Sequence, residues 1–170
     1  MRHAALALLA LMTLLPAQAG QPAPILPPGC EALQVPAGNV VSMRTFALGV
    51  QVYRWNTATN SWTFVEPIAL LFPSAGCVQP FGMHFAGPTW VLPGGGGVVG
   101  SLAASCAVDP TAINWLLVTA VSTFGHGPLA ATTFIQRVHT AGGRAPNRVG
   151  TPDEVVSVPY SAEYYFYRAQ

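Results

Sequence analysis

The most restrictive feature of this sequence is a series of short strand-like segments with no helical period among them. From residue 39 onward, runs of β-branched and aromatic residues alternate with clusters of Gly, Pro, Asn and Ser. Runs bounded in this way are typical of β-strands, and no long segment repeats its apolar residues with the 3.6-residue period of a helix. We therefore predict an all-β fold, either an antiparallel barrel or a two-sheet sandwich of about seven or more strands.

Seven segments carry the strand pattern: residues 45–55, 62–72, 89–92, 98–106, 114–123, 130–140 and 155–167. In the first segment Gln51 and Tyr53 lie on one face and apolar neighbours lie on the other, as expected of a half-buried strand. Four consecutive glycines, residues 94–97, are predicted to form a hairpin turn rather than a dinucleotide site, because no helix follows them. Pro67 and Pro159 are expected at sheet edges or bulges.

The N-terminus carries an export signal. Arg2 and His3 precede an apolar run over residues 4–15, and Ala17-Gln18-Ala19 supplies the small residues of a cleavage site, so residues 1–19 are predicted to be a signal peptide. The apolar run is shorter than the roughly 20 residues of a membrane-spanning helix, and no span is expected in the mature form. Residues 20–38 are expected to be an extended, weakly ordered Pro/Gly-rich leader, residues 39–170 a single β domain, and the protein secreted or periplasmic.

The charged residues of the chain exclude several classes of function. Charged residues make up 8% of the chain and hydrophobic residues 51%, which excludes a disordered chain kept soluble by charge. All seven basic residues are Arg, so chemistry that requires a lysine amine is excluded, including Schiff bases and Walker phosphate loops. No cluster of basic residues favours nucleic acid as a partner, and no motif indicates a cofactor.

Three cysteines, Cys30, Cys77 and Cys106, are too widely spaced for a thiolate metal site. In an exported protein they predict one disulfide and one unpaired thiol. Three single pairings are open. We favour Cys77 with Cys106, because both lie beside turn residues.

His84 is the strongest candidate for a site residue, because nearby glycines allow a close backbone approach. The alternative is a buried histidine bonded to a carbonyl group. A weaker hypothesis pairs His84 with His139 as metal ligands, together with Glu66 or Glu163. Each of these two acids is a candidate proton donor in apolar surroundings, although an ion pair with an arginine is the more ordinary arrangement.

Several blocks together resemble a known family. They are Gly49-Val50-Gln51-Val52-Tyr53-Arg54-Trp55, Gly82-x-His84-x-Ala86-Gly87-Pro88-Thr89-Trp90, Ile135-Gln136-Arg137-Val138 and Val158-Pro159-Tyr160-Ser161-Ala162-Glu163-Tyr164-Tyr165-Phe166-Tyr167. Over residues 45–167 the chain resembles the exported bacterial and fungal family known as domain of unknown function 3455. The resemblance implies no established activity.

Some fungal members of that family are labelled malate dehydrogenase-like, but this chain has neither the length nor the βαβ pattern of a nicotinamide dehydrogenase. The chain also departs from the family in one place. Where many members have a Cys shortly after the Gly-Gly-x-Ala-Pro block, it has Asn147-Arg148-Val149-Gly150, so Cys30 cannot form a bridge to that loop.

Two functional hypotheses follow. The first is an exported binding module, without chemistry, for a glycan or another small ligand at the cell envelope. Its ligand-binding candidates are Gln51, Tyr53, His84, Trp90 and Arg137, and the first four are expected to share one concave patch. The second is a small extracytoplasmic enzyme in which His84 acts with Glu66, Glu163 or a metal. A purely structural envelope protein is the remaining alternative, and it predicts no pocket.

Overall fold

The computed structural model describes residues 21–170, so the predicted signal peptide lies outside the described residues. The described chain has a short 3-10 helix and eight strands: η1 (Glu31–Leu33), β1 (Asn39–Asn56), β2 (Ser61–Phe72), β3 (Gly82–Phe85), β4 (Thr89–Val91), β5 (Gly97–Cys106), β6 (Trp115–Phe124), β7 (Thr132–Gly142) and β8 (Val155–Ala169). Within this part of the chain no helix is long and apolar enough to cross a membrane.

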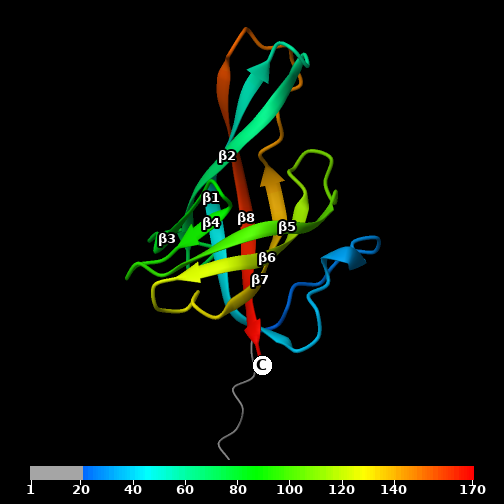
Figure 1. The fold of residues 1–170 in the computed structure, drawn as a ribbon. Helices are drawn as coiled ribbons and strands as arrows, with labels where there is room; N and C mark the ends of the chain where they lie inside the picture. The colour runs from blue at the N-terminus through cyan, green and yellow to red at the C-terminus, as the bar shows by residue number, and fades with distance from the viewer. Residues whose placement is uncertain (1–20) are drawn as a thin grey trace, which may run out of the picture.

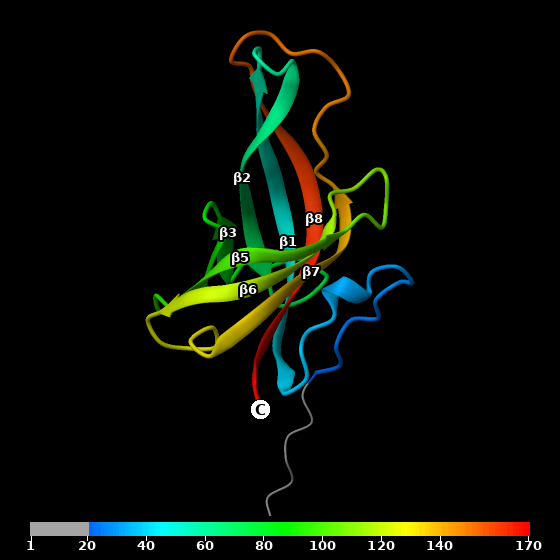
Figure 2. The same cartoon turned by 45° about the vertical axis from the view of Figure 1, so that its right-hand side comes forward.

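Each strand pairs antiparallel with the next, and β8 pairs with β1 to close a barrel. The prediction of an all-β antiparallel fold is therefore confirmed, and the barrel alternative is the correct one. The long strands β1, β2 and β8 extend well beyond the ring at one end, and β5, β6 and β7 cross them steeply (Figures 1 and 2). The sequence pattern missed β3, because this strand has only four residues and contains Gly82 and His84 in place of an apolar run.

The two predicted strand prolines lie at edges. Pro67 faces Gln51 of β1, but β2 pairs with β3 only from Ala69 onward. The pairing of β7 with β8 ends at Tyr160, one residue after Pro159. Each proline therefore has a neighbouring strand on one side only, which suits a residue without an N–H.

The glycine run forms the β4–β5 hairpin turn, as predicted. Gly94 and Gly95 have positive φ, and the Leu92 amide donates to the Gly96 carbonyl at 3.0 Å. A Cβ atom on Gly96 would lie 2.0 Å from the carbonyl oxygen of His126. The glycines thus allow the β4–β5 turn to pack against the β6–β7 loop backbone to backbone.

Apolar side chains form one cluster inside the barrel and a second on its outer surface. Tyr160, Ala162, Tyr164 and Phe166 of β8 belong to the inner cluster, and the alternate residues Tyr165 and Tyr167 belong to the outer one. The outer cluster is covered by the N-terminal segment. β8 is therefore buried on both faces over residues 164–167.

The segment over residues 21–38 packs against the barrel, which differs from the weakly ordered leader that we expected. Leu33 is fully buried in the outer cluster, and the Gln136 Nε2 group donates to its carbonyl oxygen at 2.7 Å. Figure 2 shows this blue segment lying beside β7. The high proline content had suggested an extended linker, but the few apolar residues between the prolines anchor the segment.

The disulfide prediction was wrong. Cys30 pairs with Cys106, with a Cα–Cα distance of 5.6 Å, and Cys77 is free in the loop between β2 and β3. The N-terminal segment folds back to the end of β5, where Cys106 lies, and proximity to turn residues did not reveal this long-range contact. The bridge joins the segment covalently to the barrel.

Candidate functional site

The barrel interior contains polar residues as well as an apolar core. Alternation along β1 directs Gln51 and Tyr53 inward, and alternation along β7 does the same for Arg137, two residues after the core residue Ile135. The Tyr53 hydroxyl donates to the Gly143 carbonyl at 2.7 Å. Glycine at position 143 lets the backbone lie this close to the barrel interior, because a Cβ atom there would lie 2.8 Å from Cβ of Tyr160.

Two adjoining cavities open among these residues. The larger has a volume of about 440 Å³ and includes Gln51 and Tyr53 in its lining. The smaller has a volume of about 230 Å³ and is lined by His84, Trp90, Arg137, Tyr164 and apolar side chains. Both cavities share three lining residues, Phe64, Leu116 and Arg137.

The short β3–β4 hairpin explains why the smaller cavity exists. β2 pairs with β3 only over residues 69–71, so the preceding half of β2 has no strand partner on that side. Phe64 and Pro67 from this unpaired half line the cavity, with the hairpin turn at Gly87 and Pro88 opposite them. The barrel wall is therefore incomplete at the point where the two cavities meet.

His84 is buried, with 2% of its surface exposed. Its ring stacks on Trp90, with 4.4 Å between ring centroids and 8° between planes, and its Nδ1 atom lies 3.0 Å from the Thr89 carbonyl oxygen. Burial lowers the pKa of His84 to about 4, although the bond to Thr89 opposes the shift. This neutral imidazole held by a carbonyl group matches the structural interpretation considered from the sequence.

The acids proposed as partners of His84 lie elsewhere. Glu163 accepts from Arg44 at 2.7 Å and lies 3.3 Å from Nδ1 of His139, on the outer face of β8 between the inward residues Ala162 and Tyr164. Glu66 faces Val52 in the β1–β2 ladder and lines neither cavity. Among residues 21–170, no carboxylate hydrogen-bonds to His84.

The hypothetical metal pair is not assembled either. His84 lies inside the barrel, whereas His139 lies outside it, against Trp115. The described residues contain no group of three or more His, Cys, Asp or Glu side chains arranged to hold a metal ion. Glu163 does form an ion pair with an arginine, Arg44.

The five ligand-binding candidates line two cavities rather than one patch. Gln51 and Tyr53 lie at the larger cavity, His84 and Trp90 lie at the smaller, and Arg137 lines both. Sequence reasoning missed Phe64, Leu116 and Tyr164. The two-residue alternation of β8 could have indicated Tyr164, but Phe64 and Leu116 depend on the gap in the wall.

Tyrosine hydroxyls near Arg137 remain protonated at neutral pH. Burial raises the pKa of both Tyr160 and Tyr164, and the positive charge of Arg137 opposes both shifts. The two hydroxyl groups lie 3.4 Å apart. They supply neutral hydrogen-bonding groups to an interior whose charged group is Arg137.

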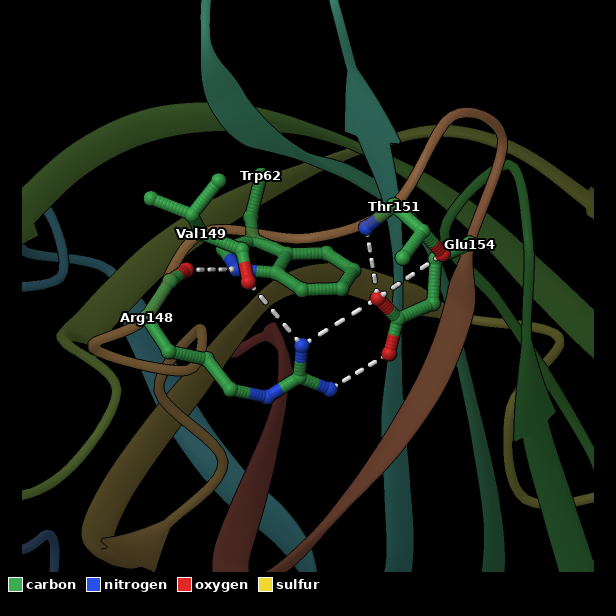
Figure 3. Close-up of polar contacts among 5 residues, drawn as sticks. All are labelled: Trp62, Arg148, Val149, Thr151 and Glu154. Carbon is green, nitrogen blue, oxygen red and sulfur yellow. Dashed lines mark hydrogen bonds and ion pairs between the residues drawn. The ribbon is translucent and has the colours of Figure 1, made fainter.

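The rim of the larger cavity is formed in part by the β7–β8 loop. Arg144 and Ala145 of this loop line the cavity, and the rest of the loop is held against the β1–β2 hairpin. Figure 3 shows the contact: the Arg148 guanidinium pairs with Glu154 and lies over the Trp62 ring, 5.2 Å from its centroid. The Trp62 Nε1 group donates to the Arg148 carbonyl at 2.9 Å.

A comparison with family models gives one match, over residues 36–168, to the family described as "Protein of unknown function (DUF3455)". No curated protein and no solved structure matches the chain. The match covers all eight strands except the last residue of β8. The barrel and the residues that line both cavities therefore lie within the matched region.

Proposed function

The chain belongs to the DUF3455 family of proteins of unknown function, and we propose that it is an exported binding module that holds a small ligand in its barrel interior. The observation that carries this proposal is the pair of adjoining cavities of about 440 and 230 Å³. Ligand sites are typically concave and largely apolar, with a few polar groups that orient the ligand. The smaller cavity supplies apolar walls, and Gln51, Tyr53 and Arg137 supply polar groups.

The interior chemistry favours binding over catalysis. The pKa of His84, about 4, keeps its ring neutral at physiological pH, and its Nδ1 atom is already bonded to the Thr89 carbonyl. A general base needs a pKa near the working pH and access to the proton that it takes. His84 therefore serves as a cavity wall that stacks on Trp90.

Export is supported by the disulfide. A bridge between Cys30 and Cys106 is typical of proteins that fold in an oxidising compartment. Secreted or periplasmic proteins are exposed to the small molecules of the cell envelope, including glycans. These molecules are the first ligands to test.

A thermal-shift screen tests the proposal. The panel consists of envelope oligosaccharides, small organic acids, alcohols and divalent metals, each added to the wild-type protein. A ligand present at 100 times its Kd stabilises the folded state by about 2.7 kcal/mol, which corresponds to a rise in Tm of roughly 5 to 10 °C for a chain of this size. We expect at least one member of the panel to give such a rise.

Two matched variants on β6 show whether the ligand occupies the cavities. Leu116→Trp fills space that both cavities share, and we expect it to abolish the shift. Val121→Trp adds the same ring at a position that is 60% exposed, and it should leave the shift intact. An equal shift in both variants would place the ligand elsewhere, and no shift across the panel would favour a structural role.

A further inference from the structure

The geometry points to an organic carboxylate as the ligand class: its head group binds Arg137, and its apolar body occupies the smaller cavity. This inference rests on the proposed function, because it assigns chemistry to the same interior space. Arg137 lines both cavities, whereas Arg144 lines the larger cavity alone, at its outer rim.

Arg137 has donors that the protein does not use. Its Nε and one terminal nitrogen donate to the Asn114 carbonyl oxygen, at 3.2 and 2.9 Å. A guanidinium group has five N–H donors. The Tyr164 hydroxyl also lies within hydrogen-bonding reach of Arg137, so the remaining donors are left for another acceptor. The ion pairs found among residues 21–170 involve Arg44, His139 and Arg148, and none of them involves Arg137.

The residues around this cation contain no opposite charge. No Asp or Glu is among the described residues that line either cavity. Arg144, at the rim, is exposed and within Coulombic reach of Asp109. Arg137 is half-buried, and even partial removal of a cation from water without a counterion is costly, so an anion bound at Arg137 would offset that cost.

A second group in the same cavity also lacks a partner. Gln51 is 2% exposed and lines the larger cavity, and its Nε2 group is buried without a hydrogen-bond partner. Buried polar groups are nearly always satisfied by protein, water or ligand. The amide is a donor, like the guanidinium, so both unsatisfied groups require an acceptor.

The smaller cavity indicates the rest of the ligand. Phe64, Val65 and Leu102 lie on its open side, and Trp90 and Val118 lie deeper. Such walls suit a short aliphatic or aromatic group. One guanidinium balances one negative charge, and its planar fork matches a carboxylate. A monoanionic carboxylate with an apolar body therefore satisfies both cavities.

Isothermal titration calorimetry with wild-type protein tests the charge requirement. The probes are linear carboxylates from butanoate to decanoate, benzoate, and the amide and alcohol that match each acid. We expect at least one carboxylate to bind ten or more times as tightly as its amide. Hexyl phosphate and hexanesulfonate test other anionic head groups, and tighter binding of either would overturn the assignment to carboxylate.

Variants locate the charge that is responsible. Arg137→Gln should weaken carboxylate binding at least tenfold while leaving binding of the matched alcohol unchanged. Arg137→Lys keeps the charge, loses the planar fork and should give an intermediate affinity. Arg54→Gln removes the same charge from an exposed position on β1, and it should bind like wild type. Near-UV circular dichroism establishes that each variant has folded.

The outcomes separate this inference from the proposed function. Equal binding of acid, amide and alcohol, blocked by Leu116→Trp, would leave the cavity as a ligand site and reject the requirement for a carboxylate. A carboxylate preference that persists in Arg137→Gln and Arg137→Lys would assign the head group to another residue and reject the role of Arg137. Failure of every probe to bind wild type would reject the carboxylate, whereas the oligosaccharides of the thermal-shift panel still test the module itself.

Discussion

At the scale of single residues, His84 shows how burial decides the role of an ionisable group. The folded protein holds its pKa at about 4, compared with 6.5 for the free side chain. The unfolded chain therefore binds a proton between these two values and the folded chain does not, so stability is lost as the pH falls from 6.5 toward 4. This lowering of the His84 pKa corresponds to roughly 3 kcal/mol at the lower end of that range.

We expect His84→Phe to remove this pH dependence. Phenylalanine can stack on Trp90 but carries no proton to bind, so urea unfolding at pH 7, 5.5 and 4.5 should give a flatter profile than wild type. The matched control is His126→Gln, at an exposed loop position, which should keep the wild-type slope. A slope unchanged in His84→Phe would show that other groups are responsible for it.

The sequence identified some interior residues and not their partners. Two-residue alternation in β1 was enough to place Gln51 and Tyr53 on one face, and they do share a cavity. The same pattern could not show that Trp90 would cover the His84 ring, because that contact depends on the hairpin between two very short strands. Local periodicity predicts the face of a strand, whereas tertiary packing determines what that face contacts.

At the scale of elements, the long connection between β7 and β8 is held by one cluster. Glu154 accepts from the guanidinium of Arg148 and from the amide of Thr151, at 2.8 Å for the latter. These bonds, with the Arg148 bond first in importance, lower the pKa of Glu154 to about 2. A carboxyl group with a lowered pKa stabilises the loop above pH 4.5, and that stabilisation is lost as the pH falls toward 2.

Arg148→Gln should loosen this loop without unfolding the barrel. The variant loses the ion pair and the contact with the Trp62 ring, so we expect hydrogen exchange at the Thr151 and Glu154 amides to accelerate severalfold, while amides of β1 and β8 within the barrel keep their wild-type rates. Arg168→Gln, a matched change at an exposed arginine near the C-terminus, should have no effect on the loop. Unchanged exchange in Arg148→Gln would mean that the backbone alone holds the loop.

Elements with a clear apolar run were predictable, and the shortest ones were not. Seven strands followed from β-branched and aromatic runs, whereas β3 has Gly82 and His84 among its four residues. The N-terminal segment was misjudged for a related reason. Its prolines and glycines dominate its composition, but Leu33 alone, fully buried on the barrel, shows that the segment packs.

At the scale of the whole molecule, closure of the barrel depends on the first and last long strands. β1 pairs with β8 from Asn39 to Arg54, residues that are more than a hundred positions apart from their partners. The sequence predicted the strands, but it did not distinguish a barrel from a sandwich, because either fold buries one face of each strand. The distinction depends on whether the two edge strands of the sheet pair with each other, and no local sequence pattern shows that pairing.

The Cys30–Cys106 disulfide is a second long-range contact, and a covalent one. Its removal gives the largest stability change that we predict. It closes a loop with a sequence separation of 76 residues, for which the loss of chain entropy in the unfolded state corresponds to about 4 kcal/mol. We expect the double variant Cys30→Ser/Cys106→Ser to lose stability of this order in urea unfolding under oxidising conditions. Cys77→Ser, which removes the free thiol, should unfold like wild type. A loss below about 1 kcal/mol in the double variant would show that burial of Leu33 and its neighbours holds the segment without the bridge.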